Sequence, residues 1–210
     1  DKLWFFMTTR QIDLSNEMDV WASDYGDDLE KADSGQLWRW YVAKLTYQLG
    51  PSHSFVAAWN SDPAEIYGDD GLKVAAEAQH IQEQGGNNLT LDYTWIASPR
   101  LFINAKLGWV RGMLNTIPES GYSEASYYDS SSRWTWGNAR SYTHNDRDKD
   151  LYQASATYFL DGVLGISHEI KAGFELHQNK DAFRSGFTGG GTYYTTQNEG
   201  EPNKKYVNED

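Results

Sequence analysis

The sequence predicts an all-β fold: an antiparallel up-and-down meander of about seven strands that forms part of a transmembrane β-barrel. Three observations predict it. Apolar and polar residues alternate in several segments, long and short connections alternate between these segments, and one face of the segments repeatedly carries charged or amide side chains. Successive side chains of a strand point to opposite faces. An outer-membrane barrel turns its apolar face to lipid and its polar face to a wet interior.

The clearest pair of strands lies at residues 88–97 and 101–111, joined by a tight turn at Ser98-Pro99-Arg100. Apolar residues such as Leu91 alternate with polar ones such as Asp92 on both sides of the turn. This period also fits a soluble sandwich whose core buries the apolar face. The other segments of the sequence are needed to distinguish the two folds.

The first half of the chain predicts strands near residues 2–10, 37–49 and 54–60, the last two joined by a turn at Gly50-Pro51-Ser52. Residues 11–35 are acidic and polar, and we expect a loop there. Residues 61–86 form a second long connection. Within it, residues 72–84 fit either a helix that ends at Gly85-Gly86 or an extension of the next strand beyond the membrane.

The second half predicts a loop from about residue 114 to 149, then strands near 151–160 and 168–177 around a brief turn at Asp161-Gly162. From about residue 179 the chain is polar and has no clear period. Long connections therefore alternate with short ones. Long structureless loops are uncommon in compact soluble domains, whereas outer-membrane barrels combine long extracellular loops with short periplasmic turns.

One face of the predicted strands carries polar residues at successive positions. Burial of unpaired charges in a dry core would cost several kcal/mol each, so we expect these residues to face a water-filled lumen: Lys44, Thr46, Asp92, Asn104, Lys106, Glu169, Lys171 and Glu175. Interfacial girdles place aromatic rings near strand ends. The candidates for such girdles are Trp38, Tyr47, Trp59, Trp95, Trp109, Tyr152 and Tyr158.

Composition excludes several classes. The net charge of -12 argues against a nucleic-acid partner, and the lack of cysteine excludes disulfides and thiolate metal sites. Mean hydropathy is -0.71, and no apolar run approaches the roughly 20 residues of a membrane helix. No secretory leader is visible at the first residues, so we expect a mature form or an internal fragment.

Four segments resemble a known family. Residues 2–6, residues 44–53, the hairpin at 91–104 and the strand at 168–175 are similar to the early barrel strands of Oar-like TonB-dependent outer-membrane receptors. The resemblance implies a barrel of about 22 strands with an amino-terminal plug, which binds or imports a ligand with energy from the TonB complex. The plug and the TonB box are missing from this sequence. We therefore expect an early piece of the barrel that starts just after the plug.

Candidate sites are few. Asp146, Asp148 and Asp150 have the spacing of a calcium loop, but Leu151 and Thr157 stand where such a loop needs Gly and Glu, so we expect a solvated acidic loop and no metal site. Asp92, Glu169 and Glu175 could serve a glycosidase, yet we interpret them as lumen lining and expect no catalytic residue and no cofactor. Flat rings among polar neighbours suit sugars or peptides. The ligand-binding candidates are the loop residues Tyr122, Tyr127, Tyr128, Trp134, Trp136 and Tyr142; packing of the loop against itself would explain them equally well.

The sequence thus predicts a non-enzymatic receptor or transporter barrel in the bacterial outer membrane. Its expected partners are membrane lipid, the TonB complex through the plug region, and a small-molecule, peptide or glycan ligand bound by the loops. The alternative is a soluble secreted all-β carbohydrate-binding module that presents the same Trp and Tyr residues on a sheet face.

Overall fold

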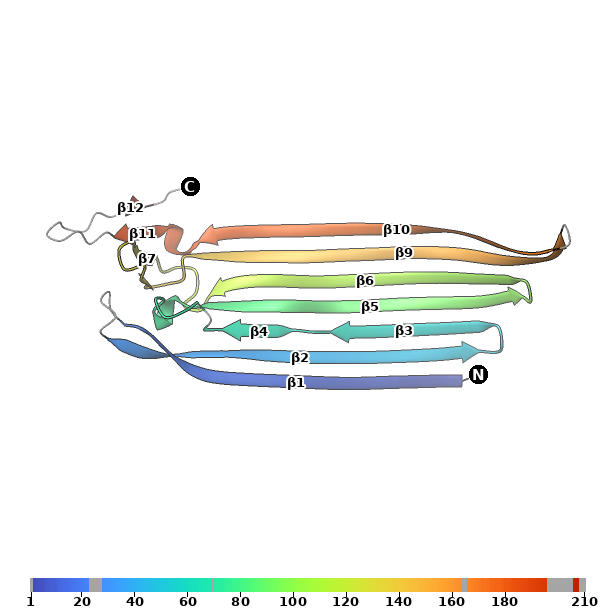
Figure 1. Cartoon of the computed structure of the whole chain (residues 1–210), viewed down its shortest axis with the longest axis horizontal. Coiled ribbons are helices and arrows are strands. Elements are labelled where there is room, and N and C mark those ends of the chain that lie inside the picture. The colour runs from blue at the N-terminus through green and yellow to red at the C-terminus, as the bar shows by residue number, and fades with distance from the viewer. Residues whose placement is uncertain (1, 23–27, 69, 164–165, 196–205, 208–210) are drawn as a thin grey trace.

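The computed structural model describes residues 2–22, 28–68, 70–163, 166–195 and 206–207. Most of them form one long antiparallel sheet (Figure 1). The strands follow the order β1-β2-β3-β5-β6-β9-β10, and β4 pairs with β2 and β5. The predicted all-β meander is therefore confirmed. The strands are β1 (Lys2–Trp21), β2 (Leu29–Leu49), β3 (His53–Ser61), β4 (Ala64–Tyr67), β5 (His80–Ser98), β6 (Leu101–Pro118), β9 (Ser141–Val163) and β10 (Ile166–Phe187).

Short turns and long connections lie at opposite ends of the sheet, as the sequence predicts. The ends of β2, β5 and β9, from which the chain continues to β3, β6 and β10, lie at the same end of the sheet as the start of β1 (Figure 1). Gly50 has a φ of 62° in the turn between β2 and β3, a left-handed conformation that glycine adopts without steric cost. The loops gather at the other end.

The strands are longer than predicted. The loop predicted at residues 11–35 is mostly wrong, because β1 continues to Trp21 and pairs with β2 from Leu29 onward, while residues 23–27 lie outside the described residues. The predicted loop at 114–149 is reduced by the extension of β6 to Pro118 and by the start of β9 at Ser141, and β10 continues to Phe187. In these extensions the backbone ladder satisfies the peptide groups, while many side chains on both faces are polar. Hydrophobic alternation, the signal used to delimit strands, is absent from the extensions of β6, β9 and β10. The extension of β1 does alternate, with Ile12, Leu14, Met18 and Val20 on one face, and sequence reasoning missed it.

The long connection before β5 is also mostly extended. Ala76–Ala78 form only a single turn of 3₁₀ helix, η1, and β5 begins at His80. The helix considered for residues 72–84 is therefore wrong, and the strand extension is correct from His80 onward. Gly85 and Gly86 lie inside β5, opposite Met113 and Gly112 of β6, and do not end a helix.

A proline explains why β3 and β4 are separate strands. The two continue one another in register along β2 and β5, and Asp62 and Pro63 fall between them. Pro63 has no N–H to donate to the ladder. On the side of β5 the pairing continues through Asp62, whose Oδ1 accepts a hydrogen bond from the Gly86 N–H at 3.0 Å and whose N–H donates to the Gly86 carbonyl oxygen at 3.2 Å.

The loop end carries a second, smaller sheet in the order β12-β11-β7-β8. Next to it lies a small hydrophobic core in which Ala75, Ala78 and Trp134 are buried against Trp21 and Trp136. Many large hydrophobic residues of the long sheet are exposed. The loops thus pack among themselves, and the faces of the long sheet have little cover. The short elements are β7 (Ser126–Asp129), β8 (Thr135–Trp136), β11 (Thr192–Thr195), β12 (Tyr206–Val207) and η2 (Thr188–Gly190).

Candidate functional site

One face of the long sheet carries a continuous apolar band near the turn end. The register aligns side chains from all seven strand positions in rows across this face, one of which is Phe5, Leu45, Ala57, Leu91, Leu107, Tyr152 and Leu176. Along β6 the band extends over nine residues, from Leu101 to Trp109, and ends at Arg111. A membrane-spanning strand needs roughly 9–11 residues. The height of the band therefore matches the hydrocarbon thickness of a bilayer.

The band is open to its surroundings even in the middle of the sheet. Leu91 and Leu107 are each 38% exposed, and Phe55 is 40% exposed. Contiguous exposed apolar surface of this kind marks contact with a membrane or with another protein. A soluble sandwich would bury these side chains beneath a second sheet, but the small second sheet lies at the loop end and the described residues place no sheet over the band.

Aromatic rings border parts of the band. Trp59 and Trp109 flank Leu89 in the last apolar row before the charged residues begin. Toward the turns, Phe55 stacks on Tyr93 with ring centroids 4.7 Å apart. Tyr152 is the last apolar residue of the band on β9, and Asp150 follows it on the same face. One residue predicted for the aromatic girdles lies elsewhere: Trp38 is on the opposite face, beyond the band.

The opposite face carries most of the charged and amide side chains of the long sheet, together with exposed apolar residues such as Trp4, Phe6 and Ile96 near the turn end. The register brings all eight residues expected in the lumen onto it: Lys44, Thr46, Asp92, Asn104, Lys106, Glu169, Lys171 and Glu175. Asp92 and Lys106 face one another across β5 and β6, with Oδ1 and Nζ 3.5 Å apart. Beside them the Thr94 hydroxyl donates to Asn104 Oδ1 at 3.0 Å. Such a surface is suited to water, because its charges need hydration or pairing.

The loop aromatics separate into groups with different surroundings. Trp134, Trp136 and Tyr127 form a stacked column, with ring centroids 4.4 Å and 5.5 Å apart, and Trp134 is only 9% exposed. The Arg140 guanidinium lies 4.9 Å from the centre of the Tyr128 ring. Most of these rings therefore pack within the loops. This agrees with the alternative to ligand binding that the sequence allowed, in which the loop packs against itself.

Tyr122 is the most accessible of the six predicted aromatics, at 47% exposure. Its ring meets Tyr142 edge to face at 4.8 Å, and its hydroxyl lies 3.3 Å from His144 Nε2. Tyr122, Tyr142 and His144 thus form a second group, separate from the stacked column. Its exposed edge keeps it a candidate for ligand contact.

A histidine links three segments at the loop end. His80 Nδ1 lies 2.8 Å from Asp70 Oδ1, and Nε2 lies 2.9 Å from the Ser141 carbonyl oxygen. A carboxylate and a carbonyl only accept hydrogen bonds, so both ring nitrogens can donate only in the imidazolium form. Burial lowers the pKa of His80, but the hydrogen bond and charge of Asp70, with the Ser141 carbonyl, outweigh it and raise this pKa above its ordinary value.

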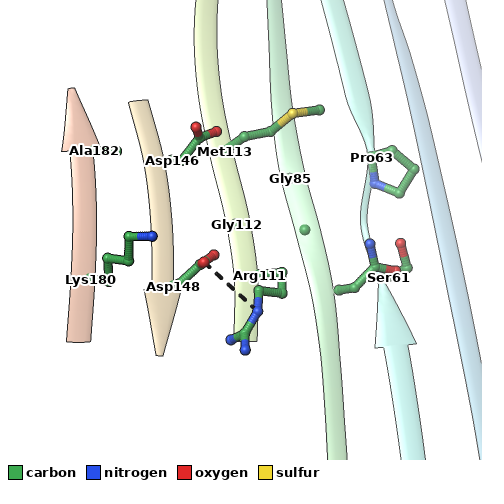
Figure 2. A pocket seen from close by; sticks show the side chains of 12 residues that line it. Ser61, Pro63, Gly85, Arg111, Gly112, Met113, Asp146, Asp148, Lys180 and Ala182 are labelled. Atoms are coloured by element: carbon green, nitrogen blue, oxygen red, sulfur yellow. Dashed lines mark ion pairs between the residues drawn. The ribbon is translucent and has the colours of Figure 1, made fainter. Parts of the chain in front are cut away.

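The three alternating aspartates lie on β9 and not in a loop, which corrects the predicted acidic loop. They pair with arginines on the face of the apolar band, just beyond it. Arg111 Nη2 lies 2.7 Å from Asp150 Oδ1, and Arg111 Nε lies 3.8 Å from Asp148 Oδ2. A shallow hollow of about 350 Å³ opens beside them, and Figure 2 shows Arg111, Asp148 and Lys180 along its border.

Sequence reasoning missed a second hollow, of about 440 Å³, lined by Gly86, Gly112 and the polar-face residues Trp38, Asn60, Asn88 and Arg147 among others. Trp38 stacks on Trp40, with centroids 5.9 Å apart and planes inclined by 9°. Trp38 and Trp40 are two residues apart and share the face of Lys44 and Thr46, so the sequence alone could have indicated an aromatic pair on the polar face. Their meeting with Asn60, Asn88 and Arg147 depends on the register of β3, β5, β6 and β9.

Comparisons with family models, with curated proteins and with solved structures found no match for this chain. Among the described residues, no helix is long and apolar enough to cross a membrane. The same residues contain no group of three or more His, Asp or Glu side chains placed to hold a metal ion. The two faces of the sheet are therefore the features that point to a function.

Proposed function

We propose that this chain forms part of a non-enzymatic receptor or transporter barrel in a bacterial outer membrane, with ligand binding on its loops and polar face. The observation that carries the proposal is the exposed apolar band on one face, nine residues high along β6, opposite a face that carries most of the charged and amide side chains of the sheet. A bilayer covers such a band, and a water-filled lumen hydrates the polar face.

The two edges of the sheet support the same proposal. Neither β1 nor β10 has a partner on its outer side among the described residues, and Phe5 and Phe174 on these strands are 83% and 64% exposed. Long unpaired edges invite further strand pairing, and in a bilayer every backbone group needs a partner. Additional strands that close a barrel would satisfy both requirements.

The TonB-dependent type of receptor is the specific form that we propose, on the basis of the Oar-like segments in β1, β2, the β5–β6 hairpin and β10. In that form, ligand uptake draws energy from the TonB complex through a plug region. A soluble carbohydrate-binding module fits less well, because it would need a cover over the apolar band.

Membrane fractionation tests the proposal. We expect the protein to remain in the outer-membrane fraction after a urea wash and to change its electrophoretic mobility on boiling, as stable barrels do. A folded, monomeric protein that stays in solution without detergent would refute the membrane proposal and favour the soluble module.

A further inference from the structure

The hollow on the polar face has a preorganised aromatic wall. Arg10 lies over the Trp40 ring at 5.4 Å from its centre, and Trp40 in turn stacks on Trp38. The Trp38 indole N–H donates to Gln36 Oε1 at 3.1 Å. These contacts fix the Trp38 ring at the border of the hollow before any ligand arrives, which reduces the entropy lost on binding.

Glycines form the floor of this hollow. A Cβ on Gly86 would lie 2.5 Å from the Arg111 carbonyl oxygen, so this position excludes any side chain. A Cβ on Gly112 would meet only ordinary contacts, at 3.5 Å from the Arg147 carbonyl oxygen. Gly112 therefore keeps space open that a side chain could occupy. Asn60, Asn88 and Arg147 border the same space with amide and guanidinium groups.

We propose that this hollow binds one sugar unit of a neutral glycan, with Trp38 against the apolar face of the sugar and Asn60, Asn88 and Arg147 hydrogen-bonded to its hydroxyls. A flat ring beside amide groups, one guanidinium and the carboxylate of Asp62 is complementary to a pyranose, whose hydroxyls both donate and accept hydrogen bonds. The proposal rests on the proposed function, in which the polar face borders water, and it names the ligand class of that receptor.

Other ligand classes fit this place less well. An extended peptide usually adds a strand to a free sheet edge, but here β3, β5 and β6 are paired on both sides. A polyanion would meet the repulsion of a chain with a net charge of -12. A neutral glycan needs neither a free edge nor a positive field.

Calorimetric titration of the detergent-extracted protein tests the assignment, with cellohexaose, chitohexaose, mannohexaose and isomaltohexaose as glycan probes and a polar hexapeptide as the competing class. We expect at least one glycan to bind. Trp38→Ala removes the ring and should raise the dissociation constant of that glycan about two- to tenfold, as expected for one aromatic contact. Trp38→Phe keeps a smaller ring and should recover part of the loss.

Gly112→Val gives an independent test, because the added side chain would fill the hollow without backbone strain. We expect it to abolish glycan binding while membrane extraction and heat-dependent mobility stay unchanged. Trp59→Phe, on the opposite face, is the matched control and should leave binding intact. Glycan binding that ignores both Trp38→Ala and Gly112→Val, binding of the peptide alone, or binding of no probe would overturn the inference. If membrane embedding persists, these results leave the proposed barrel intact. Failure to embed counts against the barrel itself.

Discussion

Ala105 offers the sharpest test of which face meets lipid, because it lies midway between Leu101 and Trp109 in the apolar band. In a bilayer, an arginine on the lipid face costs about 2–4 kcal/mol at the midplane and about 0–1 kcal/mol near the interfaces. Ala105→Arg should therefore lower the equilibrium constant for folding into phospholipid vesicles by roughly 30- to 800-fold, since about 1.4 kcal/mol corresponds to a factor of ten.

Asn104→Arg is the matched control, because Asn104 is the neighbouring residue on the polar face. It loses the hydrogen bond from Thr94, which is worth about 1 kcal/mol, and places its charge on the side that we assign to water. Denaturant titration of vesicle-inserted protein measures both variants. Equal losses of folding free energy in the two variants, or no loss for Ala105→Arg, would refute the assignment of the faces.

Three further predictions concern the loop end and the interrupted strand. Gly85 has a φ of 114°, and a Cβ there would lie 2.2 Å from the Asp62 carbonyl oxygen. Gly85→Ala should therefore lower the free energy of unfolding by about 1–3 kcal/mol in denaturant titration. Gly50→Ala, in an open turn, should lower it less, and equal losses in the two variants would contradict this reasoning. The contact of His80 with its two acceptors should be strongest below about pH 6.5, the ordinary histidine pKa, and should weaken as pH rises through the raised pKa of the folded protein. Amide hydrogen exchange around Ser141 measures this weakening, and a flat pH profile would contradict it. Trp134→Ala should destabilise the loop core by about 3–5 kcal/mol and speed limited proteolysis there, whereas Tyr122→Ala should change proteolysis little.

The sequence predicted the part of the long sheet that carries the apolar band. Around Leu91 and Leu107, alternation of apolar and polar residues is strong because one face is apolar and the other is wet. The strand order followed from this pattern, and two turns followed from Gly50 and Pro99. The turn predicted at Asp161-Gly162 was wrong, because both residues belong to β9. The grouping of the eight polar residues on one face also followed from the period alone.

The extended parts of the strands could not be predicted in the same way. In residues 143–150 of β9, for example, polar side chains point to both faces, so the backbone ladder is the main interaction that holds the strands together and leaves no period in the sequence. The interruption at Pro63 and the hollow over Gly112 depend on which strands are neighbours. The stacked column of Trp134 and Trp136 depends on loop packing, which local sequence does not encode.

Cysteine accessibility tests the central claim most directly, because the chain contains no cysteine that would add background. Thr90→Cys and Leu91→Cys place single thiols on adjacent residues of β5 that point to opposite faces. In outer-membrane fragments, we predict that a membrane-impermeant maleimide labels Thr90→Cys and spares Leu91→Cys, and that a lipid-soluble maleimide labels Leu91→Cys. Ready labelling of Leu91→Cys by the impermeant reagent in the folded protein would contradict the account.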